Sequence, residues 1–180
     1  MKPHRVFIAI NLPDGAKEKL LAYKNKWPEV PAKWTTPENL HITLAFLGNT
    51  SNQELAEVCE LMQQVGERCK PFSVDIQHIT YGPDARRPRM IWALIEKSPE
   101  LLNLQKDVEK TLGQGSDKKF FPHLTLARLK AFELQRMEWE EIPQINEEIS
   151  LSFTVSSIEV MESELKRSGP RYTICQSVLL

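Results

Sequence analysis

The sequence of 180 residues predicts an α+β fold made of two related lobes. Segments with the alternation and β-branched content of strands are interspersed with segments of helical periodicity, which is typical of α+β chains. The strand that begins at His41 is also repeated, without a gap, at His123. Such a repeat predicts a pseudo-two-fold arrangement in which two equivalent strands face each other across a cleft. We therefore expect residues 1–180 to form a single bilobal domain.

The first part of the chain predicts two strands, each followed by a helix. Residues 5–12 are rich in β-branched and aromatic side chains and predict a buried strand, and Asp14 is the expected N-cap of the next helix. A second clear strand is expected over 40–47. The helix after it is expected to begin at Ser51, because Ser51 and Glu54 have the spacing of a capping box ahead of an apolar stripe.

The rest of the chain predicts a hairpin, a helix and further strands. Strands over 72–81 and 90–96 are joined by a loop rich in proline and arginine, and the following helix has a Ser98 cap and Gly113 just beyond its end. Further strands are expected at 123–128, 149–162 and 172–179, with an acidic helical patch at 133–141 and a basic, turn-rich loop at 163–171.

Composition and charge limit the possible functions. The formal net charge is −1, from 23 basic and 24 acidic residues, so no overall field favours non-specific duplex binding. The apolar run at 7–10 is far too short to span a bilayer and no signal-peptide pattern opens the sequence, so we expect a cytoplasmic protein with no membrane partner. We also expect a monomer. Three cysteines without a C-x-x-C pair predict buried, reduced thiols.

Three clusters of basic residues are either solvated loops or contacts for an anionic partner. They are Arg86, Arg87 and Arg89; Lys118 and Lys119; and Lys166, Arg167 and Arg171.

The two copies of the string H-x-T-L carry the main functional information. Residues i and i+2 of a strand project from the same face, so His41 with Thr43, and His123 with Thr125, each place an imidazole beside a hydroxyl. The aliphatic residues between them face the core. A single copy would fit an exposed cross-strand pair, but chance placement of four histidines makes two copies improbable.

Two imidazoles and two hydroxyls on facing strands suit phosphoryl transfer at a cyclic diester. Histidine has a pKa of about 6.5, so one ring can accept a proton from water while the other donates one to the departing ribose oxygen. Threonine hydroxyls can donate hydrogen bonds to the phosphate oxygens. We expect no metal and no cofactor, because neither histidine has a third ligand at a recognisable spacing. No G-x-S-x-G elbow occurs, which argues against a serine nucleophile.

These motifs and their flanks resemble the 2H phosphoesterases, and within them the RNA 2',3'-cyclic phosphodiesterase family, also called 2'-5' RNA ligases. The resemblance covers nearly the whole chain and includes the opening strand RVFIAINLP, the approach WTTPENL and the phrase FPHLTLAR. It implies a bilobal fold in which antiparallel sheets line a central cleft with helices outside. It also implies hydrolysis of cyclic RNA ends, or of nucleoside 2',3'-cyclic phosphates, to 2'-phosphomonoesters, and weak reverse ligation.

The resemblance also implies a role for each site residue. His41 becomes the proton donor and His123 the proton acceptor, with Thr43, Thr125 and Arg128 as phosphate contacts; the residues alone do not decide which histidine is the acid. Strict alternation puts Arg128 on the face opposite to His123. Either the strand bulges, or Arg128 pairs with a carboxylate elsewhere.

Other interpretations stay open at this point. The substrate could instead be a 2',5'-linked oligonucleotide or an ADP-ribose cyclic phosphate, or the chain could be a non-catalytic RNA-binding module. His4 and His78 lie outside any motif and are expected to be structural. Four aromatic residues are either core residues or platforms for a base: Phe7, Trp34, Trp92 and Tyr172.

Overall fold

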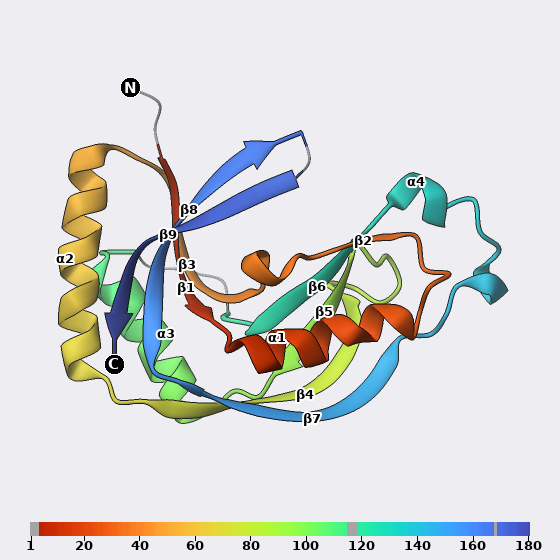
Figure 1. The fold of residues 1–180 in the computed structure, drawn as a ribbon, viewed down its shortest axis with the longest axis horizontal. Helices are drawn as coiled ribbons and strands as arrows, with labels where there is room; N and C mark the ends of the chain where they lie inside the picture. Colours follow the sequence, from red (N-terminus) through yellow and green to blue (C-terminus); the bar gives the residue numbers. More distant parts are fainter. Residues whose placement is uncertain (1–3, 115–118, 168) are drawn as a thin grey trace.

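The computed structural model describes residues 4–114, 119–167 and 169–180, so Lys118 of the second basic cluster lies outside the described residues. In this part of the chain, strands form two antiparallel sheets (Figure 1). The strands are β1 (His4–Asn11), β2 (Ala32–Trp34), β3 (His41–Thr50), β4 (Phe72–Gly82), β5 (Met90–Ile95), β6 (His123–Leu129), β7 (Asn146–Val155), β8 (Ser157–Lys166) and β9 (Gly169–Leu179). The α-helices are α1 (Asp14–Leu21), α2 (Asn52–Arg68), α3 (Pro99–Thr111) and α4 (Ala131–Leu134), and the 3-10 helices are η1 (Ala22–Asn25), η2 (Pro37–Asn39) and η3 (Trp139–Glu141).

Each motif strand lies beside the strand that precedes it in the sequence of its own sheet. The first sheet has the order β3-β1-β8-β9, and the second has the order β2-β6-β5-β4-β7. Thus β3 and β6 occupy equivalent positions beside β1 and β5, while β2 is an additional edge strand of the second sheet. The expected bilobal, pseudo-symmetric α+β fold is confirmed.

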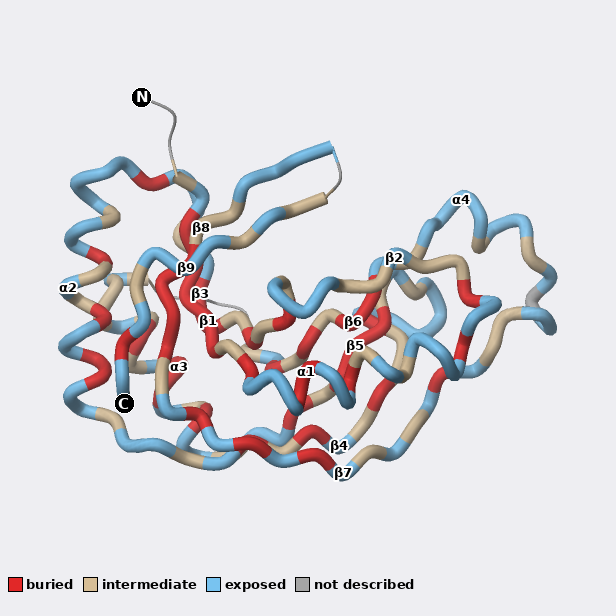
Figure 2. The backbone as a smooth tube through the Cα atoms, viewed as in Figure 1, coloured by how far each residue is buried: buried red, intermediate tan, exposed pale blue. Residues whose placement is uncertain are grey.

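Three of the α-helices pack against the sheets. α2 contacts β1, β8 and β9, α3 contacts β3 and α2, and α1 contacts β7 of the second sheet. Figure 2 shows buried backbone in the strands of both sheets and along one side of α2. A second, smaller apolar cluster of Phe7, Ala9 and Met161 is separate from the main core and packs against Tyr172.

Most helix ends follow the sequence signals. The Ser51 hydroxyl accepts a hydrogen bond from the Glu54 amide at 3.3 Å, and the Glu54 carboxylate accepts one from the Ser51 amide at 2.7 Å, so the capping box is confirmed. Ser98 also caps α3 as expected. The expectation for Asp14 is wrong, because the carbonyl of Pro13 accepts the first helical hydrogen bonds and Asp14 is already the first residue of α1.

The C-terminal region differs from its sequence-based prediction. The expected basic loop at 163–171 is wrong, since Ser163 pairs with Tyr172 and Lys166 pairs with Gly169 as the end of the β8–β9 hairpin. Gly169 has a φ of +124°, a conformation that glycine adopts readily, which permits this short connection. The expected strand at 149–162 is two strands in different sheets.

Two smaller expectations also need correction. The acidic patch at 133–141 contains one short turn of helix, α4, and the 3-10 helix η3 rather than a continuous helix. Cys175 is exposed, and Cys59 and Cys69 are partly buried, so the expectation of buried thiols is wrong for Cys175.

Candidate active site

Each motif strand contains the same β-bulge just after its threonine. The register of β3 against β1 skips Leu44, and the register of β6 against β5 skips Leu126. Two consecutive residues are therefore buried in each strand, and the next residue, Phe46 or Arg128, turns back to the face of the histidine. Of the two alternatives for Arg128, the bulge is the one that the structure shows.

The motif residues of both strands line one cavity of about 1080 Å³ between the sheets. β3 and β6 also contact each other directly. The structure thus brings together all of the site residues that the sequence singled out, which are His41, Thr43, His123, Thr125 and Arg128.

The backbone just before each motif strand orients its imidazole. His41 donates from Nδ1 to the Asn39 carbonyl at 2.8 Å, and His123 donates from Nδ1 to the Phe121 carbonyl at 2.8 Å. Because a carbonyl oxygen can only accept, Nδ1 carries the hydrogen in both rings. Each Nε2 is then an acceptor when the ring is neutral and a donor when it is protonated, as acid–base chemistry requires.

The aromatic surroundings of the two imidazoles differ. The His41 ring is tilted against Phe7, with centroids 4.9 Å apart, and edge-on to Tyr172 at 5.1 Å. The His123 ring instead stacks on Trp92 at 3.9 Å, with an interplanar angle of 27°. The indole of Trp92 rests on Gly82, where an added Cβ would lie 2.3 Å from it, so this glycine permits the close approach.

Both imidazoles are shifted toward the neutral form. Burial lowers the pKa of His41 to about 4, against the raising effect of its bond to Asn39, and the positive charges of His123 and Arg128 lower it further. Burial also lowers the pKa of His123, opposed by its hydrogen bond to the Phe121 carbonyl. The charges of His123 and Arg128 therefore act on His41 across the cavity.

The wall of the cavity is positively charged although the whole chain has a net charge of −1. Among the described residues, Glu38 is the one carboxylate of the lining, and its pKa is lowered by hydrogen bonds from its own backbone amide and from Thr36. The cations of the lining are Lys17, Lys33, Arg128, Lys166 and Arg171. Such a wall favours an anionic ligand.

Sequence reasoning missed Phe46, which lines the cavity with 71% of its surface exposed. An alignment of HITLAF with HLTLAR could have found it, because Phe46 falls at the position of Arg128. Of the aromatic candidates, Phe7 and Trp92 are buried beside the histidines, whereas Trp34 and Tyr172 are partly exposed in the cavity wall.

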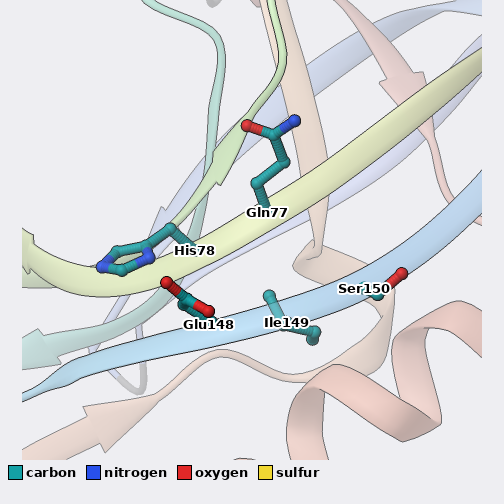
Figure 3. Close-up of a pocket in the computed structure, with 5 residues that line it drawn as sticks. All are labelled: Gln77, His78, Glu148, Ile149 and Ser150. Carbon is teal, nitrogen blue, oxygen red and sulfur yellow. The ribbon is translucent and has the colours of Figure 1, made fainter.

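The remaining histidines lie elsewhere. A second hollow, of about 500 Å³, lies on β4 and β7. Figure 3 shows His78 beside Glu148 in its lining. The Nε2 of His78 also contacts the side chain of Asn146. His4 bonds Glu162 at 2.7 Å and Asn52 at 2.6 Å, and neither His4 nor His78 lines the larger cavity.

The described residues contain no group of three or more His, Cys, Asp or Glu side chains that could hold a metal ion. Within the same part of the chain, no helix is both long enough and apolar enough to cross a membrane.

Two H-x-T strands that face each other across a cationic cavity define the class of two-histidine phosphoesterases. The family model described as LigT like Phosphoesterase matches residues 10–92 and 95–172, so the chain belongs to this family and is a phosphoesterase. The family expected from the sequence is thereby confirmed.

Individual relatives agree in sequence and in fold. A protein of Archaeoglobus fulgidus named RNA 2',3'-cyclic phosphodiesterase is 32% identical, over 93% of this chain and 96% of that one. A crystal structure from Thermus thermophilus is 30% identical with a TM-score of 0.83, over 98% of this chain and 97% of the other. Escherichia coli LigT in apo form is 26% identical with a TM-score of 0.76, over 100% and 99% of the two chains.

Proposed function

We propose that this chain hydrolyses the 2',3'-cyclic phosphodiester at the end of an RNA to a 2'-phosphomonoester. The observation that carries the proposal is that His41 and His123 line one cationic cavity with Nδ1 of each ring held by a backbone carbonyl. The printed name of the Archaeoglobus relative supports the choice of substrate.

The proposed reaction uses the two Nε2 atoms in opposite roles. Nε2 of His123 accepts a proton from a water molecule, whose oxygen forms a bond to phosphorus. The bond between phosphorus and the 3'-oxygen breaks, and Nε2 of His41 donates its proton to that oxygen. The donor and acceptor roles follow the family resemblance. The same steps, with the 5'-hydroxyl of a second RNA in place of water, form a 2'-5' bond and would give weak ligation.

Substrate binding prepares His41 for its role as a donor. In the free site its pKa of about 4 leaves the ring neutral at pH 7. A phosphate anion between the two rings favours their charged forms and raises both pKa values. His41 therefore takes up a proton as the substrate binds, and no metal ion is needed for the chemistry.

The walls of the cavity offer different contacts to the two parts of a nucleotide. The Thr125 hydroxyl and the Arg128 guanidinium both lie next to the Met90 sulfur, at 3.9 Å and 3.7 Å, so they are neighbours that can bind one phosphate together. Thr43 is the equivalent hydroxyl on the other wall. Phe46 takes the position of Arg128 on that wall and offers an apolar surface to the base.

The test is to incubate the purified protein with nucleoside 2',3'-cyclic phosphates and with cyclic-ended oligoribonucleotides, with and without EDTA. We expect 2'-phosphomonoester products in both conditions. Absence of hydrolysis, or preferred cleavage of 2',5'-linked oligonucleotides or ADP-ribose cyclic phosphate, would contradict the proposed substrate. Loss of activity in EDTA would contradict the metal-free mechanism alone.

A further inference from the structure

Lys33 lies directly opposite Arg128 in the additional edge strand of the second sheet. β2 has no counterpart in the first sheet, and it pairs with β6 in a register that joins Lys33 to Arg128 and Trp34 to Ala127. Like charges opposite each other on adjacent strands destabilise a sheet. Anionic groups of a bound ligand beside these two cations would offset their repulsion, so the pairing indicates ligand binding rather than a contribution to the stability of the sheet.

The position of Lys33 places it where the two sheets approach each other. A Cβ added to Gly169 would lie 2.8 Å from the Lys33 ammonium, so this ammonium lies against the β8–β9 hairpin of the first sheet. The Asn39 side chain donates to the Pro170 carbonyl of the same hairpin at 2.9 Å. Arg171 follows directly and lines the cavity. Cations from both sheets therefore gather at this end of the cavity.

Two other cations line this end of the cavity. Lys166 is 3.2 Å from the Glu164 carboxylate of its own strand. Arg128 belongs to the reacting phosphate, because its guanidinium shares the Met90 sulfur with Thr125. Lys33 and Arg171 come from different sheets and line the same end of the cavity, so they are the pair that we assign to a second anionic group.

The size of the cavity leaves room for such a group. Pockets of about 300–1,000 Å³ bury most of a drug-sized ligand, and a single cyclic nucleotide is in that size class. The cavity of about 1080 Å³ lies at the upper end of this range. Its wall continues from Thr125 through Arg128 to Lys33, away from the two imidazoles.

We propose that Lys33, together with Arg171, binds the phosphodiester that precedes the terminal nucleotide. The preferred substrate is then an oligoribonucleotide with a cyclic end rather than a free nucleoside cyclic phosphate. This subsite rests on the proposed function, because it takes the reacting phosphate to lie between His41 and His123.

The test compares a nucleoside 2',3'-cyclic phosphate with a cyclic-ended dinucleotide that has the same terminal base. We expect wild type to have the higher kcat/KM on the dinucleotide, and Lys33→Gln to reduce the dinucleotide-to-mononucleotide ratio about tenfold, as expected for one charge-assisted contact. Lys33→Arg should restore the ratio. Lys106→Gln, which removes an exposed lysine on the outer helix α3, is the matched control and should leave the ratio unchanged.

The salt dependence separates a phosphate contact from a structural effect. Each contact with single-stranded nucleic acid adds about 0.7 to the slope of log affinity against log salt concentration. In Lys33→Gln the slope of log KM for the dinucleotide should decrease by about this amount. A purely structural role of Lys33 would leave the slope unchanged.

The outcomes distinguish this proposal from the proposed function. If wild type cleaves both substrates and the ratio is unchanged in Lys33→Gln and Arg171→Gln, the subsite is wrong and the hydrolytic function stands. If Lys33→Gln lowers kcat/KM equally on both substrates, the subsite is also wrong, because Lys33 then acts at the reacting phosphate. If wild type cleaves neither substrate, the proposed function itself fails.

Discussion

His41 and His123 share one backbone restraint but have different neighbours. Each donates from Nδ1 to the carbonyl two residues before it, so the same nitrogen of each ring is left for chemistry. The rings beside them differ, with Phe7 and Tyr172 around His41 and Trp92 under His123. The two imidazoles are therefore not equivalent, although both motifs share the pattern H-x-T-L. This difference is what distinct acid and base roles require.

Replacement of either histidine by alanine should lower kcat by a factor of about 10²–10⁴, the usual contribution of one general acid or base. The measurement is steady-state hydrolysis of a nucleoside 2',3'-cyclic phosphate. His78→Ala is the matched control, because His78 lies in the separate hollow of Figure 3, and it should leave kcat unchanged. Near-full activity in both His41→Ala and His123→Ala would mean that other residues perform the chemistry.

At the scale of elements, the sequence predicted the strands and two helix caps but not their irregularities. A capping box depends on two residues three positions apart, so the cap formed by Ser51 and Glu54 could be predicted from the local sequence. A bulge depends on the partner strand, so alternation alone placed Arg128 on the wrong face. The outer end of the β8–β9 hairpin, expected as a loop, was missed for a similar reason, because its polar strand ends pair with each other rather than with the core.

The packing of β4, β5 and β6 around Trp92 gives a prediction at this scale. In Gly82→Ala the new Cβ would meet the indole, so the ring must move from its place under His123 and kcat should fall about tenfold. Trp92→Phe should keep most of the activity and stability, because the buried Nε1 has no hydrogen-bond partner among the described residues. Both variants can be measured by steady-state kinetics together with an NMR titration of His123. An unchanged kcat in Gly82→Ala would contradict the role of Trp92 in positioning His123.

At the scale of the whole molecule, the repeated motif predicted that the two halves would meet at one cavity, but not the chemical difference between its walls. That difference comes from single positions, such as Phe46 on one wall where Arg128 stands on the other. It also comes from β2, which adds Lys33 to one wall alone. Neither follows from the repeat, because a repeat predicts equivalence and these residues break it.

Burial of His41 between the lobes makes the stability of the fold depend on pH. Its folded pKa of about 4 lies below the unfolded value of 6.5, so the unfolded chain binds the extra proton between these values. The free energy of unfolding should therefore fall as the pH drops through this window, by up to roughly 3 kcal/mol from His41. Urea unfolding at pH 7 and at pH 4.5 measures this decrease in the free energy of unfolding. The decrease should be clearly smaller in His41→Asn. An equal decrease in wild type and variant would contradict the lowered pKa of His41.

If the two imidazoles meet one phosphate, an NMR titration of His41 and His123 with a nucleoside 2'-monophosphate should raise both pKa values together, with one dissociation constant and one ligand per chain. A response of only one ring, or saturation of the two rings at different ligand concentrations, would show that they do not share a phosphate.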